Sequence, residues 1–469
     1  MEKFSAINIG PIIATLGMAR KPRELWAASF LFSHLMKCIY AEAEATKVTI
    51  ISPAKPTEDK NKVGIYPDRI YFKGEVNAED VICDAVWRFY SDLLGQNPEK
   101  AKKPDLRYFN LMSASCEAEK ESVAIALLNQ QLDVLELCNY SSDGVVAQTI
   151  YEIIAEKRNS PLFDLADGKF IKNIKSLEEI ASIQLNSSKD IKKKSHHRYF
   201  CVVQADGDNV GKTVSHPSLN DGEVLKISKE LVKFGLEATT LIDKFGGLPI
   251  YAGGDDLLFI APVIGKDNTN IFTLIDCLEN NAFSGVKEVV DGLKLKDDKG
   301  KPIEASLSFG ISMTYYKYPL YEALESARNL LFGKAKGINE KKALAWSLRK
   351  HSGGTFEAAF SLKNETLKKQ FVDLIEATTD NDTVSAVAHK LRQEEALVDI
   401  VLASGSPDRL DALFDKVLEF DKDKAGYFNA VKAIMPTLYQ VIGKKEYIQA
   451  LYSLLRTAKF IKGEELHDE

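Results

Sequence analysis

Residues 251–259 read Tyr-Ala-Gly-Gly-Asp-Asp-Leu-Leu-Phe, two short apolar segments joined by a Gly-Gly-Asp-Asp turn. Glycine supplies the positive φ angles of tight hairpin turns, so the pattern predicts a β-hairpin whose tip carries Asp255 and Asp256. Adjacent carboxylates repel each other unless a cation neutralises them, and oxygen ligands of this kind favour Mg²⁺ or Mn²⁺. The hairpin therefore predicts a metal site. The simpler alternative is a plain Gly-Gly hairpin with solvated aspartates.

A second acidic segment, residues 204–212, reads Gln-Ala-Asp-Gly-Asp-Asn-Val-Gly-Lys and follows an apolar strand. Asp206 falls at the end of that strand. In a β-α-β-β arrangement the first strand and the hairpin are neighbours, so we expect Asp206 and Asp255 to converge on a metal pair. Asp256 and Asp208 would support them. Two metal ions bridged by carboxylates activate an attacking hydroxyl and neutralise a pyrophosphate leaving group, as nucleotidyl transfer requires.

Residues 207–213, Gly-Asp-Asn-Val-Gly-Lys-Thr, come close to a phosphate-binding P-loop but place three residues between the glycines instead of four. Asp208 would also repel a phosphate. The turn keeps the weaker prediction that backbone N–H groups at the start of a helix meet a triphosphate. Lys336 ends an amphipathic segment that begins at Leu320. It could neutralise that triphosphate or be an ordinary surface lysine.

The elements predicted around the hairpin follow the order β-α-β-β-α-β, with one more helix at 320–336. The strands are predicted at 198–205, 248–252, 257–263 and 304–316, and the helices at 225–244 and 271–293. The N-terminal region repeats the order, with strands at 7–14, 47–52, 68–73 and 106–111 and helices at 23–45 and 78–95. This order is the ferredoxin-like one. The fold class is therefore predicted as α+β with two ferredoxin-like domains.

The rest of the chain has helical periodicity. We predict four domains: a ferredoxin-like unit at 1–112, a helical spacer and linker at 113–195, the unit with the Gly-Gly-Asp-Asp hairpin at 196–350, and a helical domain at 351–469. No strand is predicted after residue 355. A Lys-rich stretch at 187–198 is interpreted as a solvated linker, since no aromatic residues alternate with its charges as in a nucleic-acid groove.

Composition is that of a globular enzyme. The 469 residues are 45% hydrophobic, and 61 Lys and Arg against 67 Asp and Glu give a net charge of −6. The chain thus lacks the basic excess of a stand-alone nucleic-acid coat. The six cysteines form no Cys-x-x-Cys pair, and no segment has the apolar length of a signal peptide or membrane span. These features predict a cytoplasmic protein that does not bind membranes.

Three segments together carry a family resemblance. The Asp206 segment (residues 205–211), the hairpin and residues 308–336 resemble the polymerase/cyclase palm of the large subunit of type III CRISPR RNA-guided effector complexes. Residues 9–35 resemble the opening of the non-catalytic first palm in the Cmr-type, type III-B branch. The matching residues there are Arg20, Arg23, Leu25, Trp26 and Ser29.

The resemblance implies an antiviral enzyme whose complex pairs a guide RNA with a foreign transcript and then converts ATP into a second messenger. The product would be a cyclic oligoadenylate, or AMP joined to an acceptor such as S-adenosylmethionine. The implied partners are sister subunits, guide RNA and target RNA. Asp206, Asp255 and Asp256 take the catalytic and metal-binding roles. The residues implied to contact the nucleotide are Gly207, Asp208, Gly253, Gly254, Ser308, Gly310 and Lys336.

Two departures from the family pattern shape these expectations. Many members begin with an HD nuclease domain, but here the first palm begins near Met1, and the one His-Asp dipeptide is His467-Asp468. We therefore expect no cleavage of single-stranded DNA, and the cysteine spacing gives no support for the zinc site of some relatives. Two alternatives remain open. A stand-alone signalling cyclase would not need the first palm, and a silent scaffold would not need the carboxylates.

Overall fold

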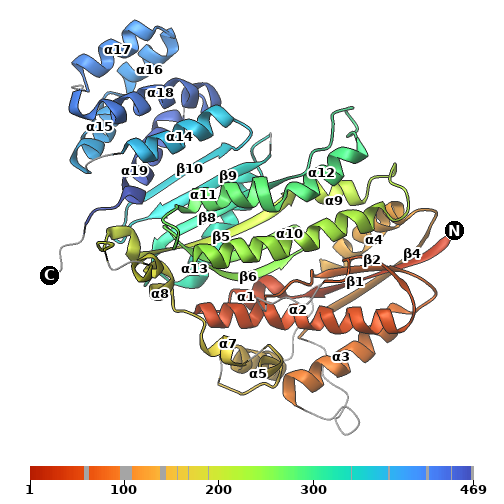
Figure 1. Ribbon diagram of the computed structural model, residues 1–469. Helices are drawn as coiled ribbons and strands as arrows, with labels where there is room; N and C mark the ends of the chain where they lie inside the picture. Colours follow the sequence, from red (N-terminus) through yellow and green to blue (C-terminus); the bar gives the residue numbers. More distant parts are fainter. Residues whose placement is uncertain are drawn as a thin grey trace.

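A computed structural model describes residues 1–56, 63–95, 108–137, 144–155, 157–166, 168–187, 190–339, 341–378, 381–418, 422–444 and 446–465. These residues form two β-sheets with helices on their faces and a group of helices toward the C-terminus (Figure 1). The prediction of an α+β fold is confirmed. The predicted elements that include residues 106 and 107, and the His467-Asp468 dipeptide, fall wholly or partly outside the described residues.

The first sheet has four antiparallel strands in the order β2-β3-β1-β4, which is the ferredoxin-like order. Its strands are β1 (Glu2–Gly10), β2 (Thr49–Ser52), β3 (Arg69–Lys73) and β4 (Asn110–Ala118). Its helices are α1 (Ile12–Leu16), α2 (Pro22–Ala45), α3 (Ala78–Leu94) and α4 (Glu121–Glu136). Alternate residues of β1 face different cores: Ile7 and Ile9 pack with α2 and α3, and Phe4 and Ala6 with α4.

The second sheet has six strands in the order β10-β9-β8-β5-β7-β6. They are β5 (Tyr199–Asp208), β6 (Leu248–Gly253), β7 (Asp256–Pro262), β8 (Ser306–Tyr315), β9 (Ala343–Arg349) and β10 (Thr355–Ser361). The first four of these form the predicted ferredoxin-like core. One face is covered by α10 (Glu223–Phe245), α11 (Ile271–Cys277), the π-helix η3 (Leu278–Ala282) and α12 (Ser284–Leu293). The other is covered by α13 (Leu320–Asn329) and the π-helix η4 (Leu330–Ala335).

The expectation of no strand after residue 355 is wrong, because β10 lies there and extends the second sheet past residue 350. The sequence of β9 also lacks the alternation of polar and apolar residues that predicts a half-exposed strand. Six of its seven residues are buried, so it lacks the polar face that marks a half-exposed strand. Trp346 of β9 stacks on Phe371 from the helices that follow, and its Nε1–H donates to Thr457 Oγ1 at 3.1 Å.

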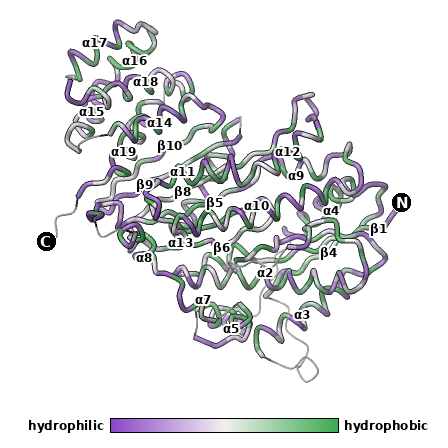
Figure 2. The backbone as a smooth tube through the Cα atoms, in the orientation of Figure 1, coloured by the Kyte–Doolittle hydropathy of each residue, from purple (hydrophilic) through white to green (hydrophobic). Residues whose placement is uncertain are grey.

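The predicted spacer, residues 113–195, begins with the end of β4 and with α4, which belong to the first unit, and its other described elements are helices, as are most of those in the C-terminal region. The spacer contains α5 (Gly144–Ile154), α6 (Leu162–Leu165), α7 (Gly168–Lys172), α8 (Leu177–Ala181), η1 (Ile183–Asn186) and η2 (Ser195–Arg198), and a short helix α9 (Val210–Val214) follows β5. The C-terminal helices are α14 (Glu365–Ala377), α15 (Asn381–Gln393), α16 (Glu395–Ser404), α17 (Pro407–Lys416), η5 (Lys422–Lys424), α18 (Ala425–Ile442) and α19 (Tyr447–Lys462). Their hydrophobic and hydrophilic residues alternate along the chain (Figure 2), as in helices that bury one face. Among the helices described, none combines the length and the apolar character needed to cross a membrane.

The first unit covers the outer edge of the second sheet. Strand β6 is an edge strand, and its Ala252 N–H donates to the carbonyl of Gly64 at 2.9 Å. Ser29 on α2 donates to the carbonyl of Ile250 at 2.8 Å. These contacts satisfy backbone groups that an open edge would leave exposed. They also bring the first unit against the strand that leads into the Gly-Gly-Asp-Asp turn.

Candidate active site

The predicted hairpin is present. Strand β6 ends at Gly253, which pairs with Asp256 at the start of β7, so Gly254 and Asp255 form the tip. Gly254 has a φ of 64°, the left-handed conformation that glycine adopts without steric cost. The Gly-Gly-Asp-Asp sequence therefore forms a tight turn that presents its carboxylates at one end of the sheet.

Asp206 lies beside this turn on the neighbouring strand. In the β5–β7 ladder Ala205 pairs with Leu257, so Asp206 is opposite the start of β7. The absence of a side chain at Gly207 allows the Asp255 carboxylate to lie against β5, because a Cβ there would fall 2.5 Å from Asp255 Oδ2. The predicted convergence of Asp206 and Asp255 thus has a geometric basis in this glycine.

The carboxylates of the turn have strongly perturbed acidity. Burial, with the nearby charge of Asp206, raises the pKa of Asp255 to about 7. Burial and the charge of Asp255 raise the pKa of Asp256 well above its usual value. Within the described part of the chain, no basic side chain forms an ion pair with either carboxylate. A cluster of this kind fits divalent cations, which would supply the missing positive charge.

Lys336 lies directly behind the turn rather than in open solvent. Its ammonium forms ion pairs with Asp206 and with Asp208, the latter at 2.8 Å, and donates to the carbonyls of Asp206 and Gly207 at 3.1 and 2.9 Å. Burial alone would lower the pKa of Lys336, but the charge of Asp206 and the hydrogen bonds to both aspartates raise it. Lys336 therefore stays charged and fixes the end of β5.

Asp208 has a different environment from the one expected of a supporting metal ligand. Its side chain is fully buried. Oδ2 accepts hydrogen bonds from the Ser306 and Ser308 hydroxyls and from the Lys342 N–H at 2.8–2.9 Å, and Oδ1 accepts from Lys336. With both oxygens engaged, Asp208 acts as an anchor for Lys336. Ser308 belongs to the same network, since its hydroxyl also accepts from the Ala343 N–H at 3.2 Å.

Two other glycines that were expected to contact the nucleotide, Gly253 and Gly310, allow close packing in this structure. A Cβ at Gly310 would lie 2.2 Å from the carbonyl oxygen of Ala327, so glycine is needed for helices α13 and η4 to approach β8. That approach places Lys336, which directly follows η4. A Cβ at Gly253 would lie 2.4 Å from the Tyr251 hydroxyl, so this glycine makes room for the Tyr251 ring.

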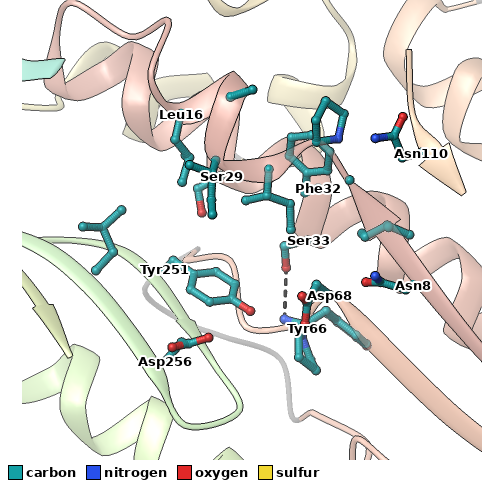
Figure 3. Close-up of a pocket in the computed structure, with 18 of the residues that line it drawn as sticks. Asn8, Leu16, Ser29, Phe32, Ser33, Tyr66, Asp68, Asn110, Tyr251 and Asp256 are labelled. Carbon is teal, nitrogen blue, oxygen red and sulfur yellow. Dashed lines mark hydrogen bonds between the residues drawn. The ribbon is translucent and has the colours of Figure 1, made fainter. Parts of the chain in front are cut away.

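A cavity of about 420 Å³ opens in front of the carboxylates, between the two ferredoxin-like units (Figure 3). Asp206, Tyr251 and Asp256 line it from the second unit. The first unit contributes Ser29, which the family resemblance had singled out, and polar residues that sequence reasoning missed, namely Asn8, Ser33, Tyr66, Asp68 and Asn110. Arg328 and the half-exposed Phe332 complete the lining. The volume falls within the range of small-molecule sites, roughly 300–1,000 Å³.

Asp68 is the most unexpected of these residues. Figure 3 shows it with Asp256 near the Tyr251 ring, so a carboxylate of the first unit faces the acidic turn of the second. Burial raises the pKa of Asp68, and its charge adds to the repulsion at Asp255 and Asp256. No local motif marks Asp68, because only the packing of one unit on the other brings it there.

A ferredoxin-like sheet with an acidic hairpin beside an aspartate on its first strand defines the palm class of domain. Residues 199–345 match the family described as Cas10/Cmr2, second palm domain. Over 190 residues the chain is 31% identical to the CRISPR system Cmr subunit Cmr2 of Pyrococcus furiosus. The match covers 34% of this chain but 19% of that protein, so the two share a fraction of the larger protein's length.

Solved structures support the same fold over most of the chain. A Csm1–Csm4 cassette in complex with AMPPNP aligns with 92% of this chain and 69% of its own at 12% identity and a TM-score of 0.54. A type III-B Cmr-β complex in the apo state aligns with 84% and 75% at 11% identity and a TM-score of 0.51. The chain is therefore similar in fold to these large subunits of type III CRISPR complexes, and residues 199–345 are similar in sequence to the Cas10/Cmr2 second palm.

Proposed function

We propose that the second palm transfers nucleotidyl groups from ATP at the site formed by Asp206, Asp255 and Asp256. The observation that carries this proposal is the meeting of carboxylates from β5 and from the β6–β7 turn beside a cavity of nucleotide size. These three residues would hold two Mg²⁺ or Mn²⁺ ions. Such ions activate an attacking hydroxyl and neutralise a pyrophosphate leaving group.

The chain's own residues prepare this site. Lys336 holds the end of β5 through Asp206, Asp208 and two backbone carbonyls, so the Asp206 carboxylate is fixed before any ligand binds. Gly207 and Gly254 shape the space and the turn for Asp255. The first unit forms the opposite wall of the cavity.

We also propose that the chain works as the large subunit of a cytoplasmic type III effector complex, with sister subunits, guide RNA and target RNA as partners. The similarity to Cmr2 and to chains solved within Csm and Cmr complexes supports this. The net charge of −6 supports it too, because a chain that bound RNA alone would need its own basic surface. The product would be a cyclic oligoadenylate or AMP joined to an acceptor such as S-adenosylmethionine.

The test is an analysis by mass spectrometry of nucleotides formed from ATP and Mg²⁺, with the isolated chain and the assembled complex each assayed with and without target RNA. We expect a product with new phosphodiester or AMP-acceptor bonds in the complex with target. Equal rates in all four samples would point to a stand-alone cyclase, and no product in any sample to a scaffold.

A further inference from the structure

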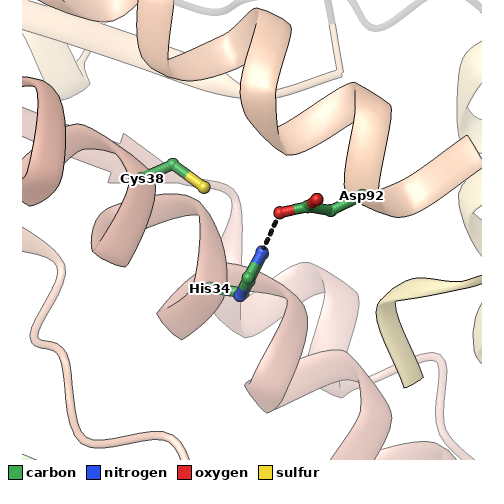
Figure 4. Close-up of side chains that lie close together, drawn as sticks. All are labelled: His34, Cys38 and Asp92. Atoms are coloured by element: carbon green, nitrogen blue, oxygen red, sulfur yellow. Dashed lines mark hydrogen bonds and ion pairs between the residues drawn. The ribbon is translucent and has the colours of Figure 1, made fainter. Parts of the chain in front are cut away.

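Helices α2 and α3 of the first unit bring three metal-ligating side chains together, away from the palm carboxylates. Figure 4 shows His34 and Cys38 on α2 facing Asp92 on α3. His34 Nε2 lies 2.8 Å from Asp92 Oδ2. One ligand atom from each of the three residues lies within 4.8 Å of the others.

The spacing in α2 explains how one helix offers two of these ligands. Residues four apart lie on the same helix face, so the His34 ring and the Cys38 sulfur point to the same side. Asp92 comes from the last turn of α3, which packs beside α2 in the core of the first unit. Three ligands from two helices can therefore reach one point without a change in backbone.

Burial distinguishes this cluster from a chance group of surface residues. His34 is 9% exposed and Cys38 is 3% exposed, while the Asp92 side chain is 31% exposed. The two interior ligands are thus shielded, and the carboxylate side is open to water. An ion could enter past Asp92, and a water molecule could occupy a fourth position there.

The ligand chemistry suits zinc. A neutral imidazole, a thiolate and a carboxylate are its usual protein ligands, at about 2.0–2.3 Å, and zinc accepts a water as the fourth ligand. Burial lowers the pKa of His34, which keeps an imidazole lone pair available. Burial also raises the pKa of Cys38 to about 12, so the ion has to displace the thiol proton.

We propose that His34, Cys38 and Asp92 bind a Zn²⁺ ion that links α2 to α3. On binding, the Cys38 thiol proton leaves to solvent and the imidazole proton resides on Nδ1, so that Nε2 and Oδ2 both bind the ion. The hydrogen bond between His34 and Asp92 is replaced by two bonds to the metal. Small side-chain movements would bring the three ligand atoms to the usual zinc distances of about 2.0–2.3 Å.

This ion would stabilise the wall of the nucleotide cavity. Helix α2 carries Ser29, Phe32 and Ser33, which line that cavity, and the Ser33 hydroxyl accepts a hydrogen bond from the Tyr66 N–H at 3.1 Å. His34 follows Ser33 directly. The proposal does not depend on the chemistry at Asp255, since its ligands all lie in the first unit.

The experiment titrates Co²⁺ into full-length chain that has been freed of metal by dialysis against a chelator. A thiolate-to-cobalt charge-transfer band reports a bond to cysteine, and the visible bands report tetrahedral geometry. We expect one equivalent of Co²⁺ to produce both bands and one equivalent of Zn²⁺ to remove them. Cys38→Ala should abolish the charge-transfer band. Cys83→Ala, at an exposed thiol on α3, is the matched control and should leave it unchanged.

Asp92→Asn provides a variant at the partly exposed ligand, where the fold is less sensitive. We expect it to keep the charge-transfer band and to weaken Co²⁺ binding at least tenfold. Zn²⁺ should raise the melting temperature of the wild-type chain and of Cys83→Ala, but not that of Cys38→Ala. Absence of the charge-transfer band in the wild-type chain, or its loss in Cys83→Ala with retention in Cys38→Ala, would overturn the proposal.

Discussion

The two ferredoxin-like units share one strand order but differ in charge at two equivalent positions, one on the first strand and one at the start of the third strand. In the second unit, Asp206 on the first strand lies opposite the start of β7. In the first unit, Asn8 on β1 pairs with Arg69 at the start of β3. The amide and the guanidinium of the first unit stand where the second unit has carboxylates.

The charge of Arg69 is balanced within the first unit. Arg69 forms ion pairs with Asp133 and Glu136 of α4 at 2.8 and 2.7 Å. Asn8 donates a hydrogen bond to Glu136. The turn carboxylates of the second unit form no described ion pair, and Lys336 pairs instead with Asp206 and Asp208 of the neighbouring strand β5. The same fold thus lines one side of the cavity in the first unit and, by our proposal, binds the catalytic metal ions in the second.

The largest effect is expected from making the second unit resemble the first. Asp206→Asn keeps the shape but removes the charge and the ion pair with Lys336. We expect the rate of nucleotide formation to fall about 10²–10³-fold, as for the loss of one preorganised charged group. The measurement is steady-state product formation from ATP. The control is Asp298→Asn on an exposed loop, and a rate within twofold of wild type for Asp206→Asn would contradict the assignment.

The second prediction concerns the contribution of Lys336 to the stability of the fold through its ion pair with the buried Asp208. Lys336→Met leaves Asp208 fully buried without its cation, so we expect the free energy of unfolding to fall by about 3 kcal/mol. The double variant Lys336→Met/Asp208→Asn should recover part of that loss. Chemical denaturation measures both. Lys334→Met breaks a half-exposed ion pair with Glu357 and should cost less than about 1 kcal/mol. Equal losses of unfolding free energy in Lys336→Met and Lys334→Met would show that the buried ion pair of Lys336 does not stabilise the fold more than a half-exposed one.

The third prediction uses the raised pKa of Asp255, about 7 in the folded chain. A carboxyl with a raised folded-state pKa stabilises the fold below its unfolded pKa and loses that contribution as pH rises through 7. Without divalent ions, Asp255→Asn should therefore stabilise the chain by about 1–2 kcal/mol at pH 8. At pH 3 it should have little effect, because Asp255 is then protonated in both the folded and the unfolded chain. Melting curves at the two pH values test this, and a pH-independent effect would exclude the raised pKa.

The smallest effect is expected in the first unit. Asp68→Asn removes a carboxylate from the cavity wall but no proposed metal ligand. We expect the KM for ATP to change less than about tenfold, with kcat unchanged, as for a group that contributes only to binding. A loss of kcat as large as that of Asp206→Asn would place Asp68 among the catalytic residues. It would also remove the functional contrast between the two units.

Local sequence patterns predicted the acidic turn, the neighbouring strand and both strand orders, because turn glycines and alternating apolar residues act over a few positions. They did not predict β9, whose residues are buried on both faces. They also missed the wall formed by Asn8 and Asp68, since it depends on packing between segments far apart in the chain. Asp208 was expected to support the metal ligands and contact the nucleotide, and no local pattern indicated its hydrogen bonds with Ser306 and Ser308, which depend on the pairing of β5 with β8.

The most direct test of the central claim is nucleotide formation from ATP by a complex that contains Asp255→Ala/Asp256→Ala. Assembly with sister subunits and guide RNA is measured in the same preparation, so that loss of activity is separated from loss of the complex. The account predicts intact assembly and no detectable product. Product formation by the double variant at the wild-type rate would contradict it.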